Sequence, residues 1–210
     1  MNKNNTPNDE NQTPYGEFTM WTIADDIWTP FCTKKNKLMV SWGYVACRCL
    51  GFADFAYKID KMYVEFENGS APISAPIPFT KFDSISYYSS LTGVKDYLRL
   101  SIDGQPTIEI APGYETYFGG NSDYTNDPYN GNRLHFSART TGTAGINGAT
   151  FGAGVSSVVY GVALVAAPLD SSTSDDVLVS RGYIDSDDQR TVSSGVQIGV
   201  TWDLTFPPAD

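Results

Sequence analysis

The chain has 210 residues and a formal net charge of −10, which arises from 24 acidic and 14 basic residues. This length suits one domain, or one domain with a terminal arm, and the acidic balance argues against a protein that binds nucleic-acid phosphates. With 18% charged and 13% aromatic residues, the composition excludes a wholly disordered chain and a coiled coil. No run of 18 apolar residues is present, and Met1–Pro7 lacks the apolar region of a signal peptide. We therefore expect no membrane span and synthesis in a cytoplasm.

Residues 1–17 are predicted to form a flexible polar arm. The segment contains five asparagines and two prolines, and its only larger apolar side chains are Met1 and Tyr15. Such a segment buries too little apolar surface to offset the conformational entropy that ordering costs.

Residues 18–61 are predicted to form an aromatic connector with one helix. Three large side chains, Trp21, Trp28 and Phe31, crowd into its first fourteen residues. A short connector rarely exposes so much apolar surface, so we expect these side chains to be covered by the body or by a sister chain in an assembly. Apolar residues then recur at helical spacing from Lys37 to Leu50, and Asn36 and Gly51 are suitable caps.

Residues 62–210 are predicted to form a β-sandwich body. From Met62 onward apolar residues alternate with polar ones, as in Met62, Val64 and Phe66. Further strands are predicted at 98–102, 107–111, 132–140, 155–167, 176–184 and 191–206, separated by glycine-rich and proline-rich turns. About seven strands with little helix predict a mainly β protein, an antiparallel sandwich of jelly-roll-like type.

Catalytic patterns are weak. The single histidine, His135, lies between Leu134 and Phe136, so alternation points it towards solvent or a neighbouring subunit. Glu65 and Glu67 are two apart on a predicted strand, about 6.5–7 Å, which is within the range of a glycosidase pair. They oppose Val64 and Phe66 and are expected to face water, so we predict no enzymatic activity.

Cofactor and metal patterns do not favour a site either. The glycine-rich run at 140–154 lacks the lysine of a phosphate-binding loop. The acidic stretches at 123–127 and 185–188 are oxygen-rich but lack the spacing of a calcium-binding loop. Three cysteines without an export signal are expected to stay reduced. We predict no cofactor and no metal.

Tyrosines gather in a loop-like stretch from 112 to 132, beside several asparagines and aspartates. Exposed aromatic rings beside polar side chains suit a carbohydrate platform and a protein interface equally well. The four residues expected to bind such a partner are Tyr114, Tyr117, Tyr124 and Tyr129.

The chain resembles virion accessory proteins of tailed bacteriophages in its Asn/Thr/Pro arm, its Gly/Ala/Thr loop at 140–154 and its strand of small and β-branched residues at Val155–Ala167. The resemblance implies a non-enzymatic structural component of a virus particle, such as a capsid decoration, neck or tail-associated protein, located in the virion. Its partners would be sister subunits and other virion proteins, without direct contact to nucleic acid or membrane. We expect a homo-oligomer, with a trimer favoured by analogy with other jelly-roll assemblies. The alternative is a module that binds a carbohydrate or receptor through loops 112–132.

Overall fold

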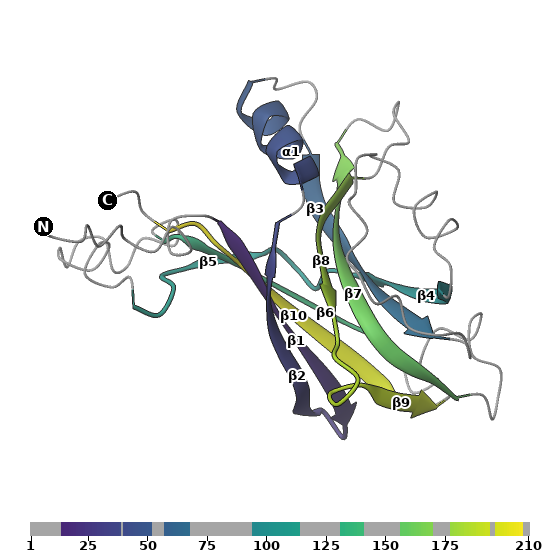
Figure 1. Ribbon diagram of the computed structural model, residues 1–210. Coiled ribbons are helices and arrows are strands. Elements are labelled where there is room, and N and C mark those ends of the chain that lie inside the picture. Colours follow the sequence, from purple (N-terminus) through teal and green to yellow (C-terminus); the bar gives the residue numbers. More distant parts are fainter. Residues whose placement is uncertain are drawn as a thin grey trace, which may run out of the picture.

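A computed structural model describes residues 14–38, 40–51, 57–67, 94–113, 131–140, 156–169, 177–193 and 196–207. Two five-stranded antiparallel sheets face each other, and one helix lies at one end of them (Figure 1). The elements are β1 (Tyr15–Ala24), β2 (Ile27–Lys37), α1 (Val40–Gly51), β3 (Tyr57–Glu67), β4 (Val94–Ser101), β5 (Thr107–Glu109), β6 (Arg133–Arg139), β7 (Ser156–Pro168), β8 (Val177–Tyr183), β9 (Arg190–Ser193) and β10 (Gln197–Thr205).

Sheet A has the strand order β2-β1-β10-β6-β5, and sheet B has the order β4-β3-β7-β8 with β9 paired to β7. The predicted mainly β antiparallel sandwich with one short helix is therefore confirmed for the described residues. The jelly-roll connectivity stays a prediction.

The core lies between the two sheets. Sheet A contributes Phe18, Met20, Val200 and Trp202, and sheet B contributes Met62, Val64, Leu164 and Val179, all fully buried. In β1 of sheet A, burial alternates with the period of two that defines a pleated strand, whereas β3, β7 and β8 of sheet B carry runs of buried residues that point to both faces. Apolar burial on this scale is the main force that holds the sheets together.

The two sheets also contact each other at two corners, and these contacts fix the position of sheet A relative to sheet B. At one corner, Leu38 forms an isolated bridge with Ser180 of β8, just beyond the end of β2. At the other, Ile102 forms a bridge with Ala138 of β6, just beyond the end of β4. The strand pairs β2–β8 and β4–β6 therefore link sheet A to sheet B on both sides.

The N-terminal boundaries differ from the sequence-based expectation. Residues 18–37, expected within a connector, form most of β1 and β2, and β1 pairs with the C-terminal strand β10 from Tyr15 to Ile23. Strand β1 already includes Tyr15, Gly16 and Glu17, which were expected in the arm. Residues 1–13 lie outside the described ranges.

Two further boundaries also differ. The strand expected at 191–206 is two strands, because β9 pairs with β7 in sheet B whereas β10 pairs with β1 and β6 in sheet A. The helix expected from Lys37 to Leu50 begins at Val40 and ends at Gly51. It packs on the sandwich through Val45, which is buried, and through Trp42, whose ring lies 5.7 Å from that of Phe206. Within the described ranges no helix has the length and apolar character that crossing a membrane requires.

Candidate functional site

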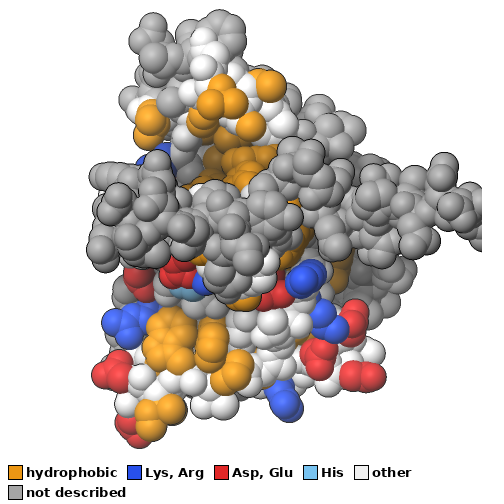
Figure 2. Space-filling model, turned by 90° about the vertical axis from the view of Figure 1, so that its left-hand side faces the viewer, with side chains coloured by type: hydrophobic (Ala, Val, Ile, Leu, Met, Phe, Trp, Pro, Cys, Tyr) orange, Lys and Arg blue, Asp and Glu red, His pale blue; other side chains and the backbone are white. Residues whose placement is uncertain are grey.

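The outward face of sheet A carries aligned rows of polar and aromatic side chains. Because β1, β10 and β6 pair in register, residues that share a row lie side by side across the sheet. One row runs through Lys35, Glu17, Asp203, His135 and Thr107 from β2 to β5. We call this surface the A face; Figure 2 views the molecule from this side and shows hydrophobic side chains lying among charged ones.

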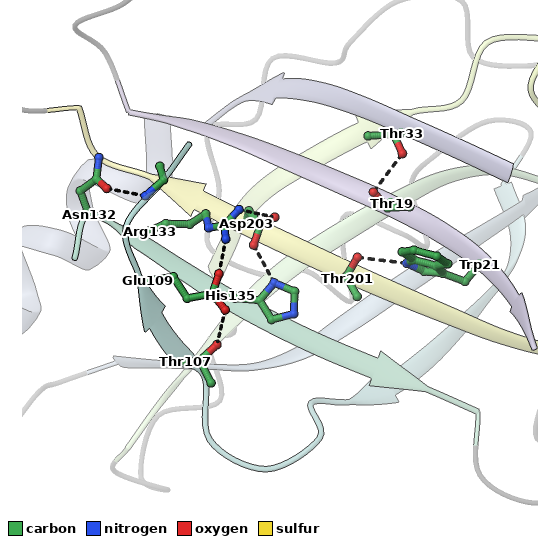
Figure 3. Close-up of polar contacts among 11 residues, drawn as sticks. Thr19, Trp21, Thr33, Thr107, Glu109, Asn132, Arg133, His135, Thr201 and Asp203 are labelled. Atoms are coloured by element: carbon green, nitrogen blue, oxygen red, sulfur yellow. Dashed lines mark hydrogen bonds and ion pairs between the residues drawn. The ribbon is translucent and has the colours of Figure 1, made fainter. Parts of the chain in front are cut away.

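Three charged side chains and His135 form a chain of contacts at the β5 side of the A face (Figure 3). Arg133 donates a hydrogen bond to Glu109, and its other terminal nitrogen lies 3.7 Å from a carboxylate oxygen of Asp203. Asp203 Oδ1 lies 2.7 Å from Nδ1 of His135. When His135 is protonated, the charges along this chain of contacts alternate in sign, so each one is partly compensated by its neighbours.

The environment of His135 favours its protonated form. The hydrogen bond to Asp203 raises the pKa of His135 above its ordinary value, and the charges of Asp203 and Glu109 act in the same direction. Partial burial and the charge of Arg133 oppose this rise. The prediction that His135 lies on the solvent side of its strand agrees with its side-chain exposure of 32%.

A second row consists of small hydroxyl side chains. Thr33, Thr19, Thr201 and Ser137 follow one another across β2, β1, β10 and β6. Thr19 and Thr33 are hydrogen-bonded at 3.0 Å, and Thr201 accepts a hydrogen bond of 3.0 Å from the indole nitrogen of Trp21. Small hydroxyl side chains therefore occupy this row of the A face.

A pair of tryptophans borders the hydroxyl row. Trp21 and Trp28 meet edge to face with ring centroids 6.0 Å apart, and both are half-buried. Trp28 lies over Gly199, where an added Cβ would come within 2.3 Å of its ring, so the missing side chain of Gly199 makes room for the indole. Trp21 and Trp28, which were expected to contribute to an assembly surface, therefore both lie on the A face. Their role in assembly stays a prediction.

Phe31 is placed differently from the two tryptophans. The pairing of β1 with β2 shifts register so that Met20 faces Cys32 and Trp21 faces Pro30, which leaves Phe31 as the extra residue of a bulge. Pro30 has no backbone N–H to donate, and prolines in sheets occur at such bulges and on edge strands. Phe31 packs against the core cluster.

The expectation that Glu65 faces water is wrong. Glu65 is fully buried, and both of its carboxylate oxygens accept hydrogen bonds from the guanidinium of Arg181, at 2.7 and 2.5 Å. Arg181 also donates a hydrogen bond to the hydroxyl of Tyr183. Alternation did point Glu65 away from the sandwich core, but this side of sheet B is itself buried, as Lys61 and Tyr63 show.

A paired-carboxylate mechanism is not supported by this arrangement. An acid–base group needs a carboxylate oxygen that can exchange a proton with substrate, whereas both oxygens of Glu65 are held by Arg181. The side chain of Glu67 lies outside the described part of the chain.

The acidic loop at 185–188 holds a cation from the protein itself. The ammonium group of Lys34 lies 2.6 Å from Asp185 and 3.0 Å from Asp188, and these contacts raise the pKa of Lys34 above its ordinary value. Across the described ranges, no three His, Cys, Asp or Glu side chains come together as metal ligands would. The acidic stretch at 123–127 and the four tyrosines Tyr114, Tyr117, Tyr124 and Tyr129 lie outside those ranges.

Sequence reasoning missed the A face as a unit. Alternation within β1 could have identified Glu17, Thr19 and Trp21 as one outward set, since Phe18 and Met20 alternate with them. The partners on β6 depend on strand order and register, for which the sequence holds no local signal. Comparison with protein-family models, with curated proteins and with solved structures finds no match for this chain.

Proposed function

We propose that the protein is a non-enzymatic structural component of a virus particle, of the capsid-decoration, neck or tail-associated kind, that assembles with sister subunits and other virion proteins. The observation that carries this proposal is the A face, an ordered outward surface that combines hydroxyl, charged and indole side chains. Indole and guanidinium groups are the side chains most enriched where protein interfaces bind tightly.

Two of the carboxylate groupings considered for chemistry lie in the part of the chain that the structure describes, and both are used internally. Glu65 is bound by Arg181, and Asp185 and Asp188 are bound by Lys34. Both ion pairs join residues more than 100 positions apart in the chain. They therefore support a role in holding the sandwich together, which suits a structural subunit.

The test is to locate the protein in purified particles from its source. We expect mass spectrometry to detect the chain in particles banded by density gradient, and antibody labelling in negative stain to place it at repeated positions. Absence of the chain from particles that retain their other structural proteins would refute the proposal.

A further inference from the structure

A cavity of about 570 Å³ lies at the end of the A face, where β1 turns into β2 and β10 begins, at the lower end of sheet A in Figure 1. Its lining includes the polar residues Thr22, Asp25, Asp26 and Gln197 and the apolar residues Ile23 and Val196. Sites for small molecules have volumes of this order and combine apolar walls with a few hydrogen-bonding groups. The cavity therefore has the size and the lining of a ligand site.

The tryptophan pair of the A face lies beside this cavity. Ile23, which lines the cavity, pairs with Trp28 across the β1–β2 hairpin. Trp21 is two residues before Ile23 in β1, so both side chains belong to the same side of the strand. An aromatic surface and a cavity with polar groups are therefore next to each other at this end of sheet A.

The protein itself holds both indole rings in place. The indole nitrogen of Trp21 donates a hydrogen bond to Thr201, towards which the ring is directed in Figure 3. Trp28 packs over Gly199, and the two rings meet edge to face. A ligand that binds against rings already fixed in this way does not have to order them, which favours its affinity.

The charges at the cavity favour a neutral ligand. Asp25 and Asp26 contribute two negative charges, and Arg139, which lies 3.5 Å from Asp26, offsets one of them. The remaining negative charge disfavours ligands that carry phosphate, sulfate or carboxylate groups. A cation held by aromatic rings needs ring faces around it, whereas Trp21 and Trp28 are in contact with each other and leave no such space.

We propose that this cavity, together with Trp21 and Trp28, binds a neutral carbohydrate. A sugar ring has an apolar face of C–H groups, which can stack on an indole, and hydroxyl groups that both donate and accept hydrogen bonds. The carboxylates of Asp25 and Asp26 and the amide of Gln197 supply acceptors and donors for those hydroxyls. The inference adds a binding function to the proposed structural role and does not depend on it.

The size of the site sets the expected strength. A cavity of about 570 Å³ has room for one or two sugar units, so a single site should bind with a dissociation constant of about 1 mM. Many copies of the chain on one surface would bind a branched or repeating glycan more tightly, because further contacts become intramolecular.

Saturation-transfer NMR with the full chain tests the proposal. The neutral probes are tetrasaccharides of glucose, galactose, mannose and N-acetylglucosamine; sialyllactose and a heparin tetrasaccharide are the acidic probes, and choline is the cationic probe. We expect saturation transfer to at least one neutral probe and to none of the charged ones. The affinity should change little when salt is added, because salt screens only interactions between charges.

Two variants connect binding to this site. Trp28→Ala should weaken binding about tenfold, because it removes a stacking surface. Asp25→Asn should also weaken it about tenfold, because it replaces a charged acceptor; asparagine tolerates the φ of 51° at this position. Asp187→Asn, at an exposed position of the loop after β8, is the matched control and should bind like the unmodified chain. Thermal melts check that each variant is folded.

The outcomes separate this inference from the proposed function. Binding of a neutral probe that Asp25→Asn weakens and Asp187→Asn leaves unchanged supports the carbohydrate site, even if Trp28→Ala does not fold. Absence of transfer to every neutral probe, a preference for a charged probe, or binding that Asp25→Asn leaves unchanged overturns it. The presence of the chain in purified particles, which decides the proposed function, is measured independently of all these results.

Discussion

Glu65 and Arg181 illustrate how a buried ion pair behaves when one partner is removed. We expect Glu65→Gln to destabilise the protein by about 3 kcal/mol, because it removes the carboxylate charge that the buried guanidinium of Arg181 contacts. Replacing both residues by apolar ones of similar volume, as in Glu65→Leu with Arg181→Met, should recover most of that loss. Urea unfolding of the two variants measures the difference. An effect of Glu65→Gln below about 1 kcal/mol, typical of surface sites, would show that the pair is not buried in solution.

His135 is the one imidazole of the chain, so its titration can be followed without assignment. We expect NMR to give a pKa above 6.5, because Asp203 stabilises the protonated ring, and Asp203→Asn should lower that pKa. A folded-state pKa above the unfolded one means that the contact stabilises the protein fully below about pH 6.5 and loses this effect as pH rises through the folded pKa. The stability difference between wild type and His135→Gln should shrink over that window. A pKa at or below 6.5 would contradict the contact.

At the scale of elements, the turn between β1 and β2 is conformationally constrained. Asp25 and Asp26 both have positive φ, 51° and 61°, in a two-residue hairpin turn that favours glycine at its second position. We expect Asp26→Gly to stabilise the protein by about 0.5 kcal/mol, since relief of the left-handed conformation exceeds the entropy that glycine adds to the unfolded chain.

The long ion pair of Asp26 with Arg139 is solvent-exposed and contributes little against this gain. Thr29→Gly is the matched control in the same hairpin, and it should destabilise because Thr29 is a strand residue whose φ is not positive. Thermal melts compare the two. Equal losses from both changes would mean that the turn at Asp25 and Asp26 is not as described.

Most of the strands could be predicted from alternation, and the exceptions have physical causes. In β1 and β2, Trp21 and Trp28 are apolar but lie on the outward face. Apolar residues therefore occur on both faces of these strands, which hid the alternation of Phe18 and Met20 in the sequence. The split between β9 and β10 was missed because alternation does not reveal which sheet a strand joins. The burial of Glu65 was missed because sheet B buries residues on both of its faces. Alternation separates the residues of a strand into two faces, but it does not show which face is exposed to solvent.

At the scale of the whole molecule, the candidate site follows from strand order. Glu17 and His135 lie 118 positions apart, and both pair with Asp203, so the A face exists only once β1, β10 and β6 have assembled. Side-chain chemistry identified the residue types but not their neighbours. Contacts between such distant segments also predict slow folding for a chain of this size. The chain loses the entropy of closing long loops before the contacts between these segments contribute stabilising free energy.

The pairing of the first strand with the last gives a test of where the folded unit begins. Deleting residues 1–13 should leave the melting temperature nearly unchanged, because the segment has Met1 as its only larger apolar side chain. Deleting residues 1–17 should lower it clearly, by about 1–3 kcal/mol in stability. That longer deletion removes Tyr15, Gly16 and Glu17, which pair with Thr205, Leu204 and Asp203 on one side and with β2 on the other. Calorimetry of both truncations measures this. Equal melting temperatures for the two would place the start of the folded unit beyond Glu17, and equal large losses would place it before Pro14.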